Sequence, residues 1–128
     1  MAQRDRFTEK ERAYLATQTL GRLATVDPHG APQNSPVGFT VNADGTIDIG
    51  GRDMGRSRKF RNIAQNNQVA FVVDDFSVRP WTVRFVEIRG VGEQLWDQNV
   101  SGPGKSREVI RIHPRHIIGY GIDDEGPR

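Results

Sequence analysis

The stretch from Gly50 to Arg61 concentrates the residue types that bind anions. It reads GGRDMGRSRKFR and holds five basic residues and three glycines between an expected strand end and an expected helix start. Ser57 stands at the expected N-cap, whereas Arg58 and Lys59 occupy the first helical turn, where the helix dipole favours carboxylates. A bound phosphate resolves this conflict, because first-turn N–H groups, a hydroxyl and two cations can bind it together. The alternative is a solvated basic face beside Asp53.

The other polar residues form no pattern typical of a metal or nucleophile site. His29 lies in an expected turn, and His113 and His116 have no carboxylate at ligand spacing, so we expect no bound metal. The chain has no Cys and no Gly-x-Ser-x-Gly motif, and it lacks the glycine pattern of a dinucleotide fold. We therefore assign no catalytic side chain. Trp81 and Trp96 are suited to stack on a planar ring, although Trp in small barrels is more often part of a core or an interface.

The composition fits one small globular domain spanning residues 1–128. The chain has 18 Lys and Arg against 16 Asp and Glu, and the resulting net charge of +2 is too small to indicate a nucleic-acid partner. No apolar run approaches the roughly 18 residues of a membrane span, and the N-terminus lacks the apolar segment of a secretory signal. We therefore expect a cytoplasmic protein without a membrane partner.

Turn chemistry and residue alternation predict a mainly β protein with two short helices. Thr8 and Glu11 have capping-box spacing, which predicts a helix over residues 9–18, and a second helix is expected over residues 57–66. Alternating or β-branched runs predict strands over residues 22–27, 31–42, 46–50, 68–74, 82–96, 107–112 and 116–122.

Two of these strands carry features that shape the sheet. Gln68–Asp74 is an apolar run, so we expect it to be buried on both faces, and the stretch from Gly90 to Gly92 allows a bulge or bend in the long strand. Closing the sheet removes exposed edges, which favours a closed or split antiparallel β-barrel. The loop over residues 97–105 and the tail over 123–128 are the segments expected to be most mobile.

The order of several segments resembles the pyridoxamine 5′-phosphate oxidase-like split-barrel superfamily. The segments are LGRLATVDPHGAPQ, SPVGF, IDIGGRDMGRSRKFRNI and VEIRGVGEQL, and the likeness extends from Phe7 to about Ile122. Within the superfamily the chain most resembles the small actinobacterial enzymes that use the deazaflavin coenzyme F420, in the subgroup that contains a tetracycline-pathway reductase. The resemblance implies an antiparallel split β-barrel and a homodimer with two cofactor grooves at the subunit interface.

The resemblance also implies which residues contact the cofactor. Residues 57–59 take the position of the Ser-Arg-Lys step that contacts the cofactor phosphate, and the second and third strands supply contacts near the ring. Arg52, Arg56 and Arg61 suit the anionic oligoglutamate tail of F420, and the FMN-binding oxidases carry an Arg and a Lys in the second strand that are missing here. The candidate cofactor-binding residues are Ser35, Pro36, Val37, Gly38, Ile49, Gly50, Gly51, Arg52, Arg56, Ser57, Arg58, Lys59 and Trp81.

Hydride transfer by a bound deazaflavin needs no protein nucleophile, which agrees with the absence of a catalytic motif. We expect the protein to reduce an activated C=C bond of a small organic substrate with hydride from reduced F420. FMN as the cofactor and a carrier role without catalysis are alternatives. A third alternative is a nucleic-acid-binding barrel that uses Arg52–Arg61 on phosphates, but exposed aromatic residues are not interleaved with that patch.

Overall fold

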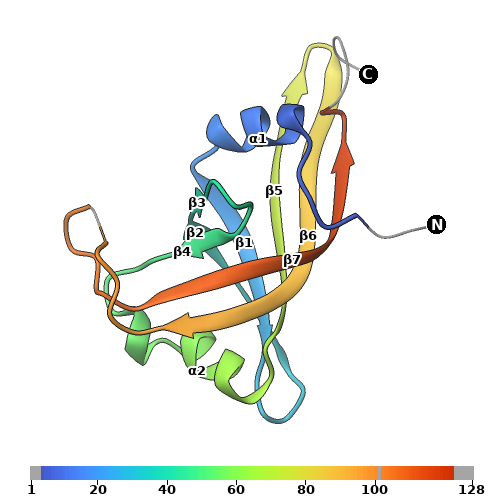
Figure 1. Ribbon diagram of the computed structural model, residues 1–128. Helices are drawn as coiled ribbons and strands as arrows, with labels where there is room; N and C mark the ends of the chain where they lie inside the picture. Colours follow the sequence, from blue (N-terminus) through green and yellow to red (C-terminus); the bar gives the residue numbers. More distant parts are fainter. Residues whose placement is uncertain (1–3, 101, 123–128) are drawn as a thin grey trace.

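Seven strands form one antiparallel sheet in the computed structural model, which describes residues 4–100 and 102–122 (Figure 1). The strands are β1 (Leu20–Val26), β2 (Pro32–Gly38), β3 (Thr40–Val41), β4 (Ile47–Ile49), β5 (Gln68–Val78), β6 (Trp81–Leu95) and β7 (Val109–Tyr120), and they neighbour one another in the order β2-β1-β5-β6-β7-β4-β3. The helical elements are α1 (Glu9–Ala16), the 3-10 turn η1 (Met54–Arg56) and α2 (Arg58–Gln65). No helix in this part of the chain is long and apolar enough to cross a membrane. The tail over 123–128, for which we predicted mobility, lies outside the described residues.

A single residue joins the two edge strands of the sheet. β2 ends at Gly38 and β3 begins at Thr40, so only Phe39 separates strands that stand at opposite ends of the strand order. The sheet therefore curls until its two edges approach each other, and Phe39 packs edge-on against Phe71 with ring centroids 5.3 Å apart. The result is the half-barrel with short helices that the sequence predicted, although residues 31–42 form two strands instead of one.

The C-terminal strand is one continuous element where the sequence predicted two. β7 pairs with β6 along its length, and the register shifts between Arg89 and Gly90. Arg115 of β7 lies between the partners of these two residues, so the bulge adds a residue to β7 and lets one strand continue through the bend. Gly90 is needed there because a Cβ would clash with the carbonyl of His113. The predicted irregularity at Gly90 is confirmed, but the additional residue belongs to the opposite strand.

β5 turns only one side to the core. Val69, Phe71 and Val73 are buried, whereas Ala70 and Val72 between them are half-exposed. The expectation that this strand is buried on both faces is therefore wrong for the single chain, because the packed elements lie on the inner side of the sheet. The opposite side, here called the outer face, is left uncovered by the residues that the structure describes.

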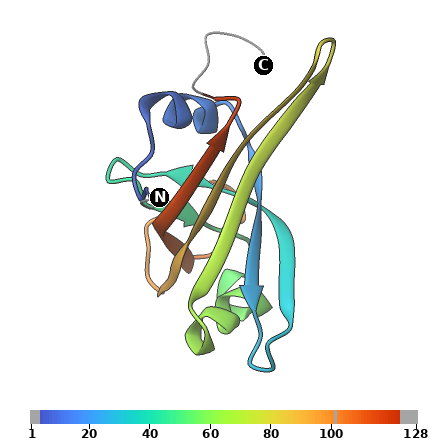
Figure 2. The same ribbon diagram turned by 90° about the vertical axis from the view of Figure 1, so that its right-hand side faces the viewer.

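The hairpin of β5 and β6 extends beyond its neighbouring strands. β1 pairs with β5 only as far as Val72, and β7 pairs with β6 only as far as Phe85. Residues 75–84 therefore form a two-stranded arm that projects from the rest of the sheet (Figures 1 and 2). The outer side of the arm carries Phe76 and Trp81, whose exposed fractions are 65% and 64%.

The inner side of the arm is fixed to α1 by a polar network. Tyr14 Oη donates to Asp75 Oδ1 at 3.0 Å, and Arg84 binds the same carboxylate through Nε at 3.0 Å and Nη2 at 2.6 Å. The Arg84 guanidinium also lies 4.8 Å from the centre of the Tyr14 ring. The hydrogen bonds from Arg84 hold the pKa of Asp75 below its ordinary value, and burial beside Asp75 raises the pKa of Tyr14. The arm is thus anchored on one side and open on the other.

Candidate functional site

Ser57 caps α2 with its hydroxyl group, as the sequence predicted. Ser57 Oγ accepts from the Phe60 N–H at 3.3 Å and donates to the Met54 carbonyl at 2.7 Å. The hydroxyl proton is therefore already engaged within the chain, and a bound anion would compete with the Met54 carbonyl for it. The N–H groups of Arg58 and Lys59 lie in the first turn, have no intrahelical acceptor and point toward the helix start.

Most cations around the start of α2 lack a carboxylate partner in the part of the chain that the structure describes. The cations without an ion pair there are Arg52, Arg58, Lys59 and Arg61. Arg56 lies 3.9 Å from Asp53, but both side chains are exposed, so this pair is weak. The local excess of positive charge favours an anionic ligand over a self-neutralised surface.

The pairing register places the second-strand candidates on two faces. Ser35 pairs with the buried Leu23 of β1, so Ser35 points to the core. Alternate residues of a strand share a face, so Val37 also points to the core. Pro36 and Gly38 lie on the outer face. The Val37 side chain is 6% exposed, so its contact with a cofactor would come from the backbone. Ile49 is fully buried, so its contact with a cofactor would also come from the backbone. Ser35 Oγ is buried without a hydrogen-bond partner among the described residues.

The turn at Gly50 and Gly51 is tied to a segment that the sequence did not assign to the site. The Ser106 N–H donates to the Gly51 carbonyl at 2.8 Å, and Ser106 Oγ accepts from the Met54 N–H at 3.0 Å. Glu108 accepts from the Gly55 N–H at 3.2 Å. The loop between β6 and β7 is therefore held against the basic segment. No local pattern signals these contacts, because they join residues more than 50 positions apart.

Trp81 does not lie near the other candidates within one chain. It begins β6 at the tip of the arm, while α2 lies at the opposite end of the sheet (Figure 1). Its ring packs on that of Phe76, with centroids 5.5 Å apart. Contact between Trp81 and a cofactor bound at α2 would therefore require Trp81 of another subunit.

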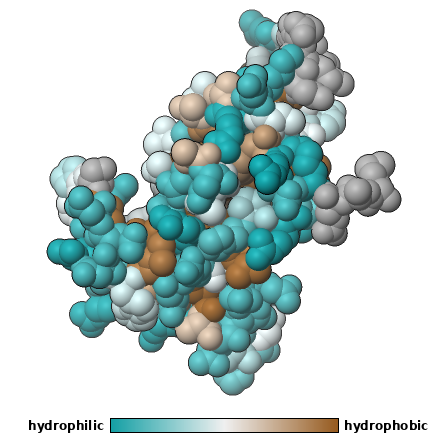
Figure 3. All heavy atoms as spheres, in the orientation of Figure 1, coloured by the Kyte–Doolittle hydropathy of each residue, from teal (hydrophilic) through white to brown (hydrophobic). Residues whose placement is uncertain are grey.

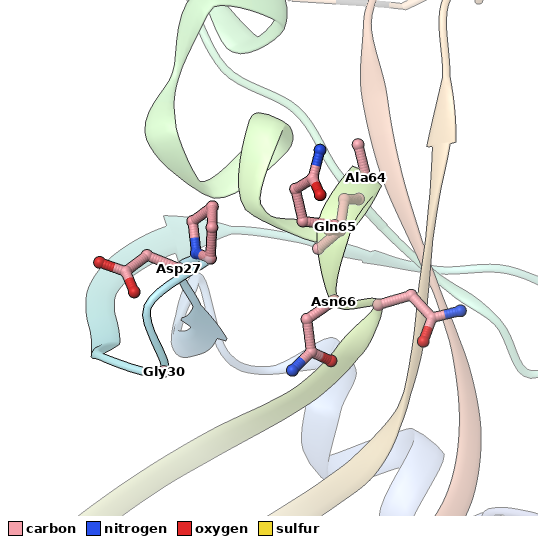
Figure 4. Close-up of a pocket in the computed structure, with 8 residues that line it drawn as sticks. Asp27, Gly30, Ala64, Gln65 and Asn66 are labelled. Carbon is pink, nitrogen blue, oxygen red and sulfur yellow. The ribbon is translucent and has the colours of Figure 1, made fainter.

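A cavity of about 520 Å³ at the far end of α2 contains none of the predicted site residues. It is lined by Asp27, Pro28, Gly30, Ile63, Ala64, Gln65, Asn66 and Asn67. The side chains of Gln65 and Asn66 point in different directions, and the Asp27 carboxylate points away from both (Figure 4). The N–H of Ala31 is the main cause that lowers the pKa of Asp27, with a smaller contribution from Arg58. Because its polar groups do not converge, this cavity is a poor candidate for a specific site.

The outer face carries a larger and more apolar hollow of about 650 Å³. Its apolar lining includes Ala24, Ala70 and Val91, and its polar lining includes Arg89 and His116. His116 Nδ1 is buried and has no hydrogen-bond partner in the described residues. Figure 3 shows a face of the molecule that is mainly polar, on which hydrophobic side chains form small separate groups.

Sequence comparison decides the family. Residues 7–120 match the family described as pyridoxamine 5′-phosphate oxidase. The chain belongs to the pyridoxamine 5′-phosphate oxidase family. This family member is 52% identical over 122 residues to a 5a,11a-dehydrotetracycline/5a,11a-dehydrooxytetracycline reductase of Streptomyces rimosus, and the alignment covers 93% of this chain and 86% of the relative. The predicted resemblance is confirmed.

Solved structures support the fold of this family member. A conserved hypothetical protein from Mycobacterium tuberculosis superposes with a TM-score of 0.72 at 21% identity, covering 94% of this chain and 89% of that one. A candidate pyridoxamine 5′-phosphate oxidase from Lactobacillus delbrueckii gives a TM-score of 0.69 at 24% identity, with 90% and 95% coverage. The split-barrel prediction is therefore confirmed.

The residues around α2 of this family member fit a phosphate-bearing cofactor. The two first-turn N–H groups and the side chains of Arg58 and Lys59 are donors without a partner carboxylate in the described chain. Such a donor set matches a phosphate dianion in both charge and hydrogen-bonding capacity. The exposed Arg52 and Arg61 extend the positive charge beyond a single phosphate.

Proposed function

We propose that the protein is an oxidoreductase that uses reduced F420 to reduce an activated C=C bond of a small, planar organic substrate. The observation that carries this proposal is the set of unpaired cations around the start of α2, which extends from Arg58 and Lys59 to Arg52 and Arg61. A single phosphate needs only the first two of these cations. An acidic tail attached to that phosphate would bind the remaining cations, Arg52 and Arg61. The 52% identity to a dehydrotetracycline reductase supports reduction as the reaction.

The residues of this chain bind and orient the reactants in this proposal. Arg58 and Lys59 hold the phosphate, and Pro36 and Gly38 on the outer face lie along the ring. When bound, the reduced deazaflavin would supply the hydride and solvent would supply the proton that completes reduction of the C=C bond, so the protein would contribute position and electrostatics. Side chains at Val37 and Ile49 hold the strands in place from the core side.

The proposal includes a homodimer whose two copies cover each other's outer face. Two-stranded arms are marginally stable in water, and the arm over 75–84 exposes Phe76, Val78 and Trp81. The same face carries Arg22 paired with Asp74 and Arg89 paired with Glu87. These pairs leave little net charge on the face, which favours packing against an identical surface. The arm then brings Trp81 of one copy to the cofactor groove of the other.

FMN is the alternative cofactor, because the phosphate site at Arg58 and Lys59 would accept it as well. A cofactor carrier without catalysis is the second alternative. Side-by-side equilibrium titration of the protein with F420 and FMN tests the cofactor, followed by assay of F420H2 oxidation with a dehydrotetracycline. Tighter binding of F420 and substrate-dependent oxidation support the proposal. Equal affinity for FMN, or binding of F420 without turnover, would replace it with the corresponding alternative.

A further inference from the structure

A third cavity, of about 340 Å³, adjoins the proposed cofactor site. It lies between the corner that joins β2 to β3, the outer side of β4 and β7, and the loop after β6. Gly38 and Gly50, two of the candidate cofactor residues, both line it. The C-terminal end of that loop is held in place, because Ser106 binds the Gly51 carbonyl.

Lys105 brings an uncompensated positive charge into this cavity. Its Cδ lies 3.7 Å from the point that a Cβ would occupy at Gly50, and its Nζ lies 3.8 Å from the corresponding point at Gly102 of the same loop. Asp48 is the acidic residue that lines the cavity, and its two oxygens are bound by Arg111 at 2.8 and 2.9 Å. Lys105 itself forms no ion pair with any described residue. The ammonium group is therefore free to bind an oxygen of a ligand.

The remaining walls combine apolar side chains with amides that can bind the oxygen atoms of a ligand. Phe39, Val100 and Val109 supply apolar surface, while the amides of Gln98 and Asn99 supply donors and acceptors. Polar groups form more of the exposed lining than apolar groups do, which suits a ligand that presents several oxygen atoms. A volume of about 340 Å³ is at the lower end of the range for small-molecule sites, so the cavity accepts the oxygen-bearing rings of a drug-sized molecule.

We propose that this cavity binds the substrate and that Lys105 determines its specificity. The inference rests on the proposed function and deepens it by naming the substrate class: a planar polycyclic compound that presents keto or enolate oxygens. Lys105 binds one of these oxygens through a charge-assisted hydrogen bond, and Phe39 and Val109 contact the ring. A substrate placed here lies next to Gly38 and Gly50, beside the cofactor.

The test compares three variants of the full chain in two binding assays. Lys105→Gln removes the charge, Lys105→Arg keeps it, and Arg107→Gln removes a cation from the same loop that does not line the cavity. Tetracycline serves as the probe, and its own fluorescence reports binding to the protein without cofactor. F420 is titrated separately. We expect Lys105→Gln to weaken tetracycline binding about tenfold, Lys105→Arg to stay within about threefold of wild type, and both to bind F420 normally.

The outcomes separate this inference from the proposed function. Unchanged tetracycline affinity in Lys105→Gln would overturn it, and so would an equal loss in Arg107→Gln, because loop order would then explain the effect. A parallel loss of F420 affinity would assign Lys105 to the cofactor and also overturn it. Failure of the wild-type protein to bind F420 counts against the proposed function alone, since the tetracycline assay contains no cofactor. Urea unfolding of each variant shows that it is folded.

Discussion

The Ser106 N–H donates to the carbonyl of Gly51 across 55 residues of sequence, and this bond joins the loop that carries Lys105 to the segment that carries Arg52. Ser106 Oγ adds a second bond to the same carbonyl at 3.1 Å and accepts the Met54 N–H. Ser106 therefore helps to position these two chain segments, together with the bond from the Gly55 N–H to Glu108.

Replacing Ser106 by Ala is expected to lower the free energy of unfolding by about 1–2 kcal/mol, because the part-buried Met54 N–H loses its acceptor. Urea denaturation measures this change. Ser77→Ala, at an exposed position of the arm, is the matched control and should alter stability by less than about 0.5 kcal/mol. Equal stability of the two variants would show that water replaces the lost acceptor.

Replacing Arg58 or Lys59 by Ala is expected to weaken F420 binding by about 1.5–3 kcal/mol each, the size of a charge-assisted contact with phosphate. The free energy of unfolding should hardly change, because neither cation forms an ion pair with a described residue. Fluorescence titration gives the affinities, with Arg107→Gln as a control for the loss of one positive charge. Wild-type affinity in both variants would refute the phosphate assignment.

Salt is expected to weaken F420 binding more than FMN binding. Arg52, Arg56 and Arg61 are exposed, and salt screens exposed charges over a Debye length of about 8 Å at physiological ionic strength. FMN has one phosphate and no acidic tail, so it should respond less. Changing the three arginines to Gln together should remove most of the difference while Arg58 and Lys59 still bind the phosphate. Equal salt slopes for both cofactors in the wild-type protein would favour FMN.

Light scattering of the wild-type protein at micromolar concentration is expected to give about twice the chain mass of 14.4 kDa. Replacing Trp81 by Glu places a charge on the apolar side of the arm and should shift the protein toward monomer. Ala13→Glu, at an exposed position of α1, should leave the mass unchanged. A wild-type mass of one chain would remove the model of a groove shared between subunits.

Stability is expected to fall at acidic pH through Asp75. Hydrogen bonds from Arg84 lower the pKa of Asp75 in the folded state, so its stabilising effect is complete above the ordinary pKa and is lost as pH falls through the lower folded value. The loss should therefore lie below about pH 4. Asp75→Asn should be clearly less stable than wild type at neutral pH, and the gap should narrow toward about pH 3 in urea denaturation. A constant gap would assign the effect to packing instead.

The sequence alone determines where both helices begin and where the basic residues cluster. Thr8 and Ser57 cap α1 and α2 as their sequence neighbours predict, since capping hydrogen bonds span only three residues. The turns that end in Gly30 and Gly45 follow the same rule, because both glycines adopt positive φ. The proposed phosphate site follows from the sequence for the same reason, because its candidate donors are consecutive in the chain.

The tertiary structure decided which side of each strand faces the core and which loop lines the proposed substrate cavity. The alternation along Gln68–Asp74 is invisible in a run of apolar residues, and only packing on one side of the sheet leaves Ala70 and Val72 half-exposed. Nothing in the sequence distinguishes Lys105 from other loop lysines. The bond from Ser106 to Gly51 brings the Lys105 side chain next to Gly50. These relationships depend on strand register and on contacts between distant residues, which local propensities do not encode.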